Sequence, residues 1–91
     1  MDIKLFEYFL VIAREENMSK AATILHVSQP TLSRQIMQLE EELGKPLFIR
    51  GSRNLQLTNE GYIFKQRAEE MVTLANKIKQ EINSESTDLV G

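Results

Sequence analysis

Residues 21–36 read AATILHVSQPTLSRQI, and this stretch decides the fold. Its two alanines and Leu25 form one small apolar side, which predicts a short helix over residues 20–25 that a neighbouring helix can approach closely. His26 follows at the turn, where the backbone often needs a positive φ, and histidine is enriched in that conformation. The stretch therefore predicts a helix, a tight turn and a second helix, with His26 in a structural role.

The second helix of this unit is predicted over residues 29–43. Ser28 is a suitable N-cap, and Pro30 lies in the first turn, where its missing N–H costs little. Gly44 is suited to end the helix in a left-handed conformation. The predicted inward side chains, at spacings of four, three and four, are Leu32, Ile36, Leu39 and Leu43.

Further segments on both sides complete the predicted architecture. An N-terminal helix is predicted over residues 3–15, and Ser19 is a suitable N-cap for the helix that follows. The apolar face of the first helix consists of Phe6, Phe9, Leu10 and Ala13. Residues 47–50 and 55–57 are predicted short strands, and the turn-forming residues 51–54 join them into a β-hairpin, or wing.

A long final helix is predicted over residues 59–83, with Thr58 as its cap. We expect Tyr62, Ile63 and Phe64 in its first turn to pack on the domain's own core. The later apolar residues lie too far along the helix for that, so a second copy of the chain is the simplest partner, through a two-fold contact. The predicted dimer interface, repeating every 3.5 residues, is Phe64, Ala68, Met71, Ala75, Ile78 and Ile82.

The predicted fold class is mainly α, a winged helix-turn-helix followed by a long linker helix for dimerisation. The winged unit has three helices and a two-stranded β-hairpin wing and covers residues 1–58. The linker helix covers residues 59–83. Residues 84–91 are expected to be a disordered tail or the start of a hinge.

Composition excludes several functional classes. The 91 residues include no cysteine and one histidine, and the four glycines are scattered. Most metal sites, nucleophilic enzymes and Gly-rich phosphate loops therefore lack their parts, and we expect no catalytic site, metal or cofactor. No apolar run approaches the roughly 20 residues that span a bilayer. The absence of cysteine fits a reducing compartment, so we expect a cytoplasmic protein without a membrane partner.

The formal net charge of −2 is unevenly distributed. Five cations and three glutamates lie between residues 19 and 58, whereas four cations and six acidic residues lie from residue 59 onward. We interpret the three glutamates, Glu40 to Glu42, as a solvated helix surface. The helix-turn-helix unit thus carries the positive surplus, which is the distribution expected for a nucleic-acid partner.

The polar side of the helix over residues 29–43 carries groups that can read base edges in DNA. Arginine can bond guanine in bidentate fashion, glutamine can do so with adenine, and serine suits several edges. The polar residues off the apolar stripe are Gln29, Ser33, Arg34, Gln35 and Gln38. On the hairpin, Arg50 and Arg53 suit flanking phosphates or a narrow minor groove. On an arbitrary helix, a polar face of this kind usually contacts only water. Here the preceding helix, the turn and the wing favour a role in binding DNA bases.

The order of these parts resembles the N-terminal DNA-binding domain of LysR-type transcriptional regulators, over about residues 1–83. The opening DIKLFEYFLVIARE is similar to the family's first helix. The stretch SKAATILHVSQPTLSRQIMQLEEELGKPLF is similar to its most diagnostic part, with Ala-Ala, Ser-Gln-Pro, Leu-Ser and Leu-Glu-x-x-Leu-Gly at fixed spacing. The stretch LFIRGSRNLQLTNEG is similar to its wing. Glu60, where the family often has alanine, and the short wing tip Gly51-Ser52 depart from the pattern.

This resemblance implies roles for individual residues. Base contacts are implied for Gln29, Pro30, Ser33 and Arg34. Contacts to phosphates or the minor groove are implied for Ser19, Lys20, Thr31, Gln35, Arg50 and Arg53. Arg53 is the residue expected nearest the minor groove.

The resemblance also implies sequence-specific binding of double-stranded DNA by a homodimer on an approximately palindromic operator. A small-molecule inducer would bind only the family's larger C-terminal domain, so we expect this chain to be a truncated form of a bacterial regulator. The alternatives are a protein-binding winged helix without DNA readout and a purely structural coiled-coil module.

Overall fold

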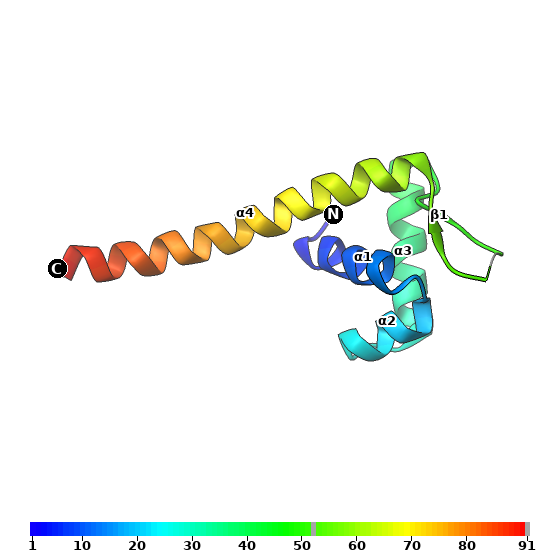
Figure 1. Ribbon diagram of the computed structural model, residues 1–91, viewed down its shortest axis with the longest axis horizontal. Coiled ribbons are helices and arrows are strands. Elements are labelled where there is room, and N and C mark those ends of the chain that lie inside the picture. The colour runs from blue at the N-terminus through cyan, green and yellow to red at the C-terminus, as the bar shows by residue number, and fades with distance from the viewer. Residues whose placement is uncertain (52, 91) are drawn as a thin grey trace.

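The computed structural model describes residues 1–51 and 53–90, with side chains described up to residue 84. Three helices and a hairpin form a globular unit, and a long helix extends away from it (Figure 1). The elements are α1 (Ile3–Glu15), α2 (Met18–Leu25), α3 (Gln29–Leu43), β1 (Phe48–Ile49), β2 (Gln56–Leu57) and α4 (Asn59–Val90). The predicted mainly α, winged helix-turn-helix architecture is confirmed.

The junction between α1 and α2 is tighter than predicted. Glu16 ends α1 in the left-handed conformation, with φ at 55°. The side chain of Asn17 then accepts the backbone N–H of Lys20 at 2.8 Å. Asn17 is therefore the N-cap of α2, and the prediction that Ser19 caps this helix was wrong. Because the cap directly follows the left-handed residue, α2 starts at Met18.

The turn between α2 and α3 has the predicted form. His26 has a φ of 59°, in the left-handed region, and ends α2. The hydroxyl of Ser28 accepts the backbone N–H of Thr31 at 3.2 Å, which confirms Ser28 as the N-cap of α3. Gly44 ends α3 with a φ of 74°. Local capping chemistry thus fixes the direction in which α3 leaves the turn.

The hairpin strands are each two residues long, shorter than predicted. They pair in antiparallel fashion, with Phe48 opposite Leu57. Leu55, predicted to be in a strand, instead donates its backbone N–H to the carbonyl of Glu16 at the end of α1, at 3.0 Å. Thr58 caps α4 as predicted. The hairpin is therefore attached to the globular unit on its return side.

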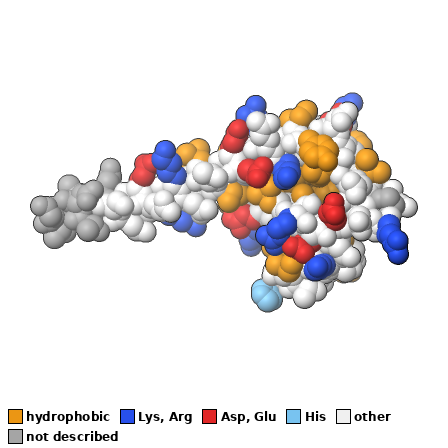
Figure 2. Space-filling view, in the orientation of Figure 1, with side chains coloured by type: hydrophobic (Ala, Val, Ile, Leu, Met, Phe, Trp, Pro, Cys, Tyr) orange, Lys and Arg blue, Asp and Glu red, His pale blue; other side chains and the backbone are white. Residues whose placement is uncertain are grey.

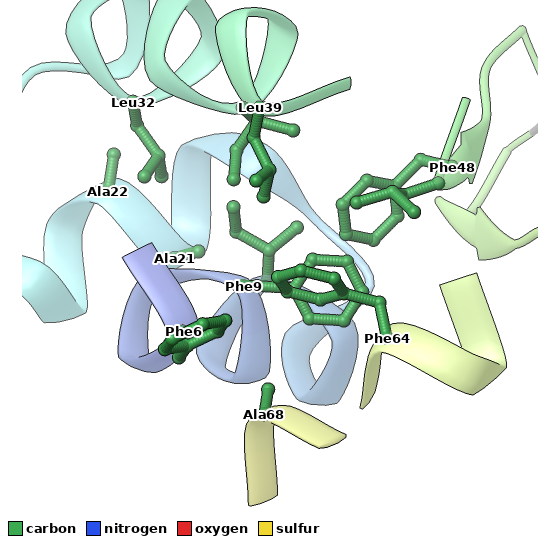
Figure 3. Close-up of a cluster of buried hydrophobic side chains, with 12 residues drawn as sticks. Phe6, Phe9, Ala21, Ala22, Leu32, Leu39, Phe48, Phe64 and Ala68 are labelled. Carbon is green, nitrogen blue, oxygen red and sulfur yellow. The ribbon is translucent and has the colours of Figure 1, made fainter. Parts of the chain in front are cut away.

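An aromatic cluster joins α1, β1 and α4 in the core (Figure 3). The fully buried ring of Phe9 lies 5.0 Å from that of Phe48 and 4.7 Å from that of Phe64, measured between centroids. The Phe6 ring lies 5.4 Å from that of Phe64. The α3 side chains that complete the core are Leu32, Ile36 and Leu39, all predicted to face inward.

Some details of the predicted core were wrong. Leu43 is 39% exposed, because it belongs to the last turn of α3 and lines an open cleft beside α4. Ile12 is fully buried and was not predicted. Leu10 and Ala13, predicted on the apolar face, are half-buried. The buried line of α1 is therefore rotated slightly from the predicted one.

The first turns of α4 pack on the core through Gly61, Phe64 and Ala68. These residues are three and four positions apart, so they share one side of the helix. Tyr62 and Ile63 lie off that side and are 59% and 63% exposed. The prediction that these two side chains pack on the domain's own core was wrong.

The remainder of α4 continues beyond the globular unit to Val90. The sequence prediction ended the helix at residue 83, but residues 84–90 contain neither proline nor glycine to stop it. Within the described part of the chain, none of the helices is long and apolar enough to span a membrane.

Candidate nucleic-acid interface

The N-terminal half of α3 presents its polar face to solvent. Gln29, Pro30 and Arg34 are exposed, and Ser33 is half-buried beside them. No carboxylate of the described residues lies within ion-pair distance of Arg34. The four residues predicted to read bases therefore lie within the first two turns of one helix. The guanidinium of Arg34 is open to an external acceptor.

Thr31 and Gln35 lie towards the other side of α3. The hydroxyl of Ser28 donates to the hydroxyl of Thr31 at 2.7 Å, so the Thr31 side chain belongs to the helix cap. Gln35 and Gln38 line a shallow surface pocket with Lys4 of α1. Lys4 is a cation that the sequence pattern did not single out, because it lies far from α3 in sequence.

The start of α2 carries Ser19 and Lys20, which are both exposed. The ammonium of Lys20 lies 3.5 Å from the carboxylate of Glu15. A hydrogen bond from Arg14, at 2.8 Å, is the largest cause that lowers the pKa of Glu15, and the charge of Lys20 adds to it. Lys20 is thus oriented by α1 while its side chain remains accessible.

The wing places its two arginines in different surroundings. Arg50 forms an ion pair with Glu40 of α3, with Nη2 and Oε1 3.1 Å apart. Arg53 is exposed and has no carboxylate partner among the described residues. Arg53 is therefore the wing cation whose charge is not offset by a neighbouring side chain.

Glu40 is more enclosed than the sequence indicated. Its side chain is only 11% exposed, and Oε2 accepts the backbone N–H groups of Leu47 and Phe48 at 2.7 and 3.2 Å. The prediction of a solvated glutamate surface holds for Glu41 and Glu42, which are exposed, and was wrong for Glu40. Residue spacing within α3 could not reveal a partner in the hairpin.

Charge is mixed over the molecule rather than gathered in one patch. Figure 2 shows basic and acidic side chains interspersed over one face of the globular unit and along α4, with apolar side chains between them. On that face, no broad patch of positive or negative charge marks an interface. The geometry of α3 and the wing therefore indicates a DNA interface more clearly than the net charge does.

The outer side of α4 has a row of exposed apolar side chains, which we call the α4 row: Met71, Leu74, Ile78 and Ile82. Of the residues predicted for the dimer interface, Phe64 and Ala68 are instead buried in the chain's own core, so they cannot offer surface to a partner. Ala75 is half-buried. Leu74, which is 53% exposed, was not predicted because it lies outside the chosen heptad positions.

Comparison with known families gives an independent result. Residues 3–62 match the family described as bacterial regulatory helix-turn-helix protein, lysR family. The chain belongs to this family. This match includes all three helices of the globular unit and the whole wing.

Curated relatives of this LysR-family chain are transcriptional regulators. It is 53% identical over 68 residues to a probable cat1 operon transcriptional activator of Acinetobacter lwoffii, covering 75% of the chain and 22% of that protein. It is 41% identical over 91 residues to the transcriptional activator IlvY of Haemophilus influenzae, covering the whole chain and 31% of that protein. The chain thus spans less than a third of the length of these two relatives.

Solved structures similar to the LysR-family chain include domains bound to DNA. The BenM DNA-binding domain on benA site 1 DNA matches with a TM-score of 0.91 and 37% identity, covering 94% of this chain and 97% of that one. The CbnR DNA-binding domain in its DNA complex matches with a TM-score of 0.88 and 35% identity, covering 94% and 99%. Both matches extend over the globular unit and most of α4.

Proposed function

We propose that this chain binds double-stranded DNA in a sequence-specific manner, with α3 in the major groove and the wing beside it. The observation that carries the proposal is the polar face of α3 with the exposed Arg34, which has no carboxylate partner in the part of the chain that the structure describes. That face belongs to a fold that matches the DNA-bound BenM domain with a TM-score of 0.91. The N-terminal residues of a recognition helix are the ones that reach base edges in helix-turn-helix proteins.

Four residues of α3 are proposed to contact bases. Arg34 can donate two parallel hydrogen bonds to guanine, and Gln29 can bond adenine through both ends of its amide. Ser33 can donate or accept, and the ring of Pro30 offers apolar contact, for example to a thymine methyl group. These roles agree with the burial of the four side chains, since Gln29, Pro30 and Arg34 are exposed and Ser33 is half-buried beside them.

Backbone contacts are proposed around this centre, because phosphate contacts fix the register of a protein on DNA without reading sequence. The residues are Ser19, Lys20, Thr31, Gln35, Arg50 and Arg53. Arg53 is proposed to enter or flank the minor groove, where a narrow groove attracts arginine. Arg50 uses only some of its five N–H donors on Glu40, which leaves others for phosphate.

The change Arg34→Ala tests base reading. We expect affinity for the selected site to fall by about 1–3 kcal/mol, with little change in affinity for random DNA, because one base contact is removed. Fluorescence anisotropy titrations on both duplexes measure the two effects. Lys79→Ala, which removes one exposed positive charge from α4, is the matched control. Equal losses on both duplexes would assign Arg34 to phosphate and refute base reading by this residue.

We further propose that two chains pair through the α4 row and present two α3 helices to an approximately palindromic site. Four large apolar side chains exposed at spacings of three, four and four on one helix favour burial against a second copy. A cleft of about 360 Å³ lies beside Met71, between α4 and the end of α3. It extends the apolar surface of the row towards the globular unit.

Ile78→Glu tests this pairing, because it places a carboxylate in the middle of the α4 row. We expect the variant to sediment as a monomer and to bind a two-half-site duplex no better than a single half-site. Gln80→Glu adds the same charge at an exposed polar position and should remain a dimer. Identical sedimentation of the two variants would rule out the α4 row as the contact.

The wider role is proposed from the relatives. We propose that the chain serves transcription regulation in the bacterial cytoplasm, without catalysis, as part of a longer regulator that responds to a small molecule. The supporting observation is that the chain spans 22% and 31% of two relatives that are transcriptional activators.

A further inference from the structure

The connection between α3 and the wing depends on an enclosed carboxylate. Glu40 lies three turns after the start of α3, and its side chain is 11% exposed. Its Oε2 atom accepts the backbone N–H groups of Leu47 and Phe48, at 2.7 and 3.2 Å, where the chain enters β1. Its Oε1 atom lies 3.1 Å from Nη2 of Arg50, the residue that directly follows β1.

We propose that Glu40 is a positioning residue that holds the wing in a fixed place relative to the reading helix, so that Arg53 meets the minor groove. This inference rests on the proposed DNA binding. Glu40 is not proposed to touch DNA, and it acts through the backbone of β1 and the guanidinium of Arg50. Hydrogen bonds to an ionised carboxylate are short and strong compared with neutral ones, so this contact is well suited to hold a short strand.

The remaining attachments of the hairpin do not replace this contact. Leu55 donates to the carbonyl of Glu16 at 3.0 Å, and the Thr58 hydroxyl donates to the carbonyl of Pro46 at 2.7 Å. The first bond fixes the return side of the hairpin, and the second joins the start of α4 to the chain that enters β1. On the outgoing side, the ring of Phe48 packs on that of Phe9 of α1, and Glu40 supplies the hydrogen bonds that join β1 to α3. Each strand is only two residues long, so the strand pairing itself is short.

Glu40 also gives the two wing arginines different surroundings. The Glu40 carboxylate pairs with Arg50 at the base of the wing, whereas Arg53, nearer the tip, has no carboxylate partner among the described residues. The guanidinium of Arg50, although paired with Glu40, can still help to orient β1. We therefore expect the wing's contribution to DNA affinity to come mainly through Arg53, and only when Glu40 holds the strand.

A double-mutant cycle between Glu40→Gln and Arg53→Ala tests the proposal. Glutamine has nearly the same shape, but it is neutral, and its NH2 group cannot accept the N–H of Arg50 that pairs with Oε1. Its single oxygen is a weaker acceptor than the carboxylate for the Leu47 and Phe48 N–H groups. We expect Arg53→Ala to lower affinity about tenfold in the native background and less than about threefold beside Glu40→Gln. Glu41→Gln removes the same charge from an exposed neighbour and should leave the effect of Arg53→Ala unchanged.

Equal effects of Arg53→Ala in the native, Glu40→Gln and Glu41→Gln backgrounds would overturn the proposal. A second measurement does not need DNA, namely hydrogen exchange of the Leu47 and Phe48 amides. We expect faster exchange in Glu40→Gln than in Glu41→Gln, and equal rates would also overturn the proposal. Glu40→Asp, which keeps the charge and shortens the reach, replaces Glu40→Gln in both tests if the glutamine variant does not fold. If the native chain binds no DNA, the proposed function fails, and the exchange rates still decide whether Glu40 positions the strand.

Discussion

Gly61 in the first turn of α4 is expected to tolerate no side chain, although alanine is the better helix former. A Cβ atom at this position would lie 2.1 Å from the carbonyl oxygen of Leu47 and 3.0 Å from Cδ2 of Leu57. The first contact involves backbone, so α4 or the chain entering β1 must move by roughly 1 Å to relieve it. Such overpacking costs up to about 3 kcal/mol, and the helix propensity of alanine returns about 1 kcal/mol.

We therefore expect Gly61→Ala to lower the free energy of unfolding by about 2 kcal/mol. With a denaturant slope near 1 kcal/mol per molar urea, the midpoint should fall by roughly 2 M. Urea titrations followed by circular dichroism at one fixed protein concentration measure this shift, since dimerisation makes stability depend on concentration.

Gly44→Ala is the matched control for this prediction. A Cβ there meets nothing within 4 Å, but the φ of 74° is unfavourable for alanine. This change should cost only the left-handed conformation, about 1 kcal/mol. A Gly61→Ala variant as stable as the native chain, or more stable than Gly44→Ala, would refute the proposed close approach of α4 to the wing.

Three further predictions concern DNA binding, the core and pH. Arg53→Ala should reduce the salt dependence of DNA affinity by about one unit of slope in titrations at several salt concentrations, and an unchanged slope would exclude a phosphate contact. Phe9→Ala should cost about 3–5 kcal/mol in urea unfolding, because its fully buried ring contacts two other rings, and a loss below 1 kcal/mol would contradict this packing. The hydrogen bond from Arg14 lowers the pKa of Glu15 from its ordinary value of 4.5, so its ionised form stabilises the fold above that pH and the benefit disappears as pH falls through the lowered pKa. Glu15→Gln should therefore be less stable than the native chain at pH 6 and about equal to it at low pH, and a constant difference in urea midpoint would contradict the assignment.

Much of the fold could be predicted from the sequence because the signals that set it are local. Ser28 accepts an N–H three residues away, and Gly44 adopts the left-handed conformation that ends α3. These features depend on a few neighbouring residues, so their positions follow from residue type and spacing. Ser19 was wrongly preferred as a cap over Asn17 because both residues are good caps and the sequence alone does not place the end of α1.

The parts that the sequence did not reveal depend on distant contacts. A heptad pattern marks apolar residues on α4 but does not show which side α1 covers, so Ala68 was assigned to a dimer instead of the core, and Phe64 was assigned to both. Glu40 is similar, because its partners lie seven to ten residues away, in the hairpin. The α3 face that includes Arg34 could be predicted, because its exposure follows from the buried side of the same helix.

Selection of binding sites from random duplexes, followed by anisotropy titration of the enriched sequence at several salt concentrations, tests the central claim most directly. We expect enrichment of a dyad-symmetric sequence with half-sites about one helical turn or a multiple apart. We also expect an affinity that falls steeply as the salt concentration rises. Weak binding with no enriched sequence at any salt concentration would contradict the claim that α3 of this chain reads DNA.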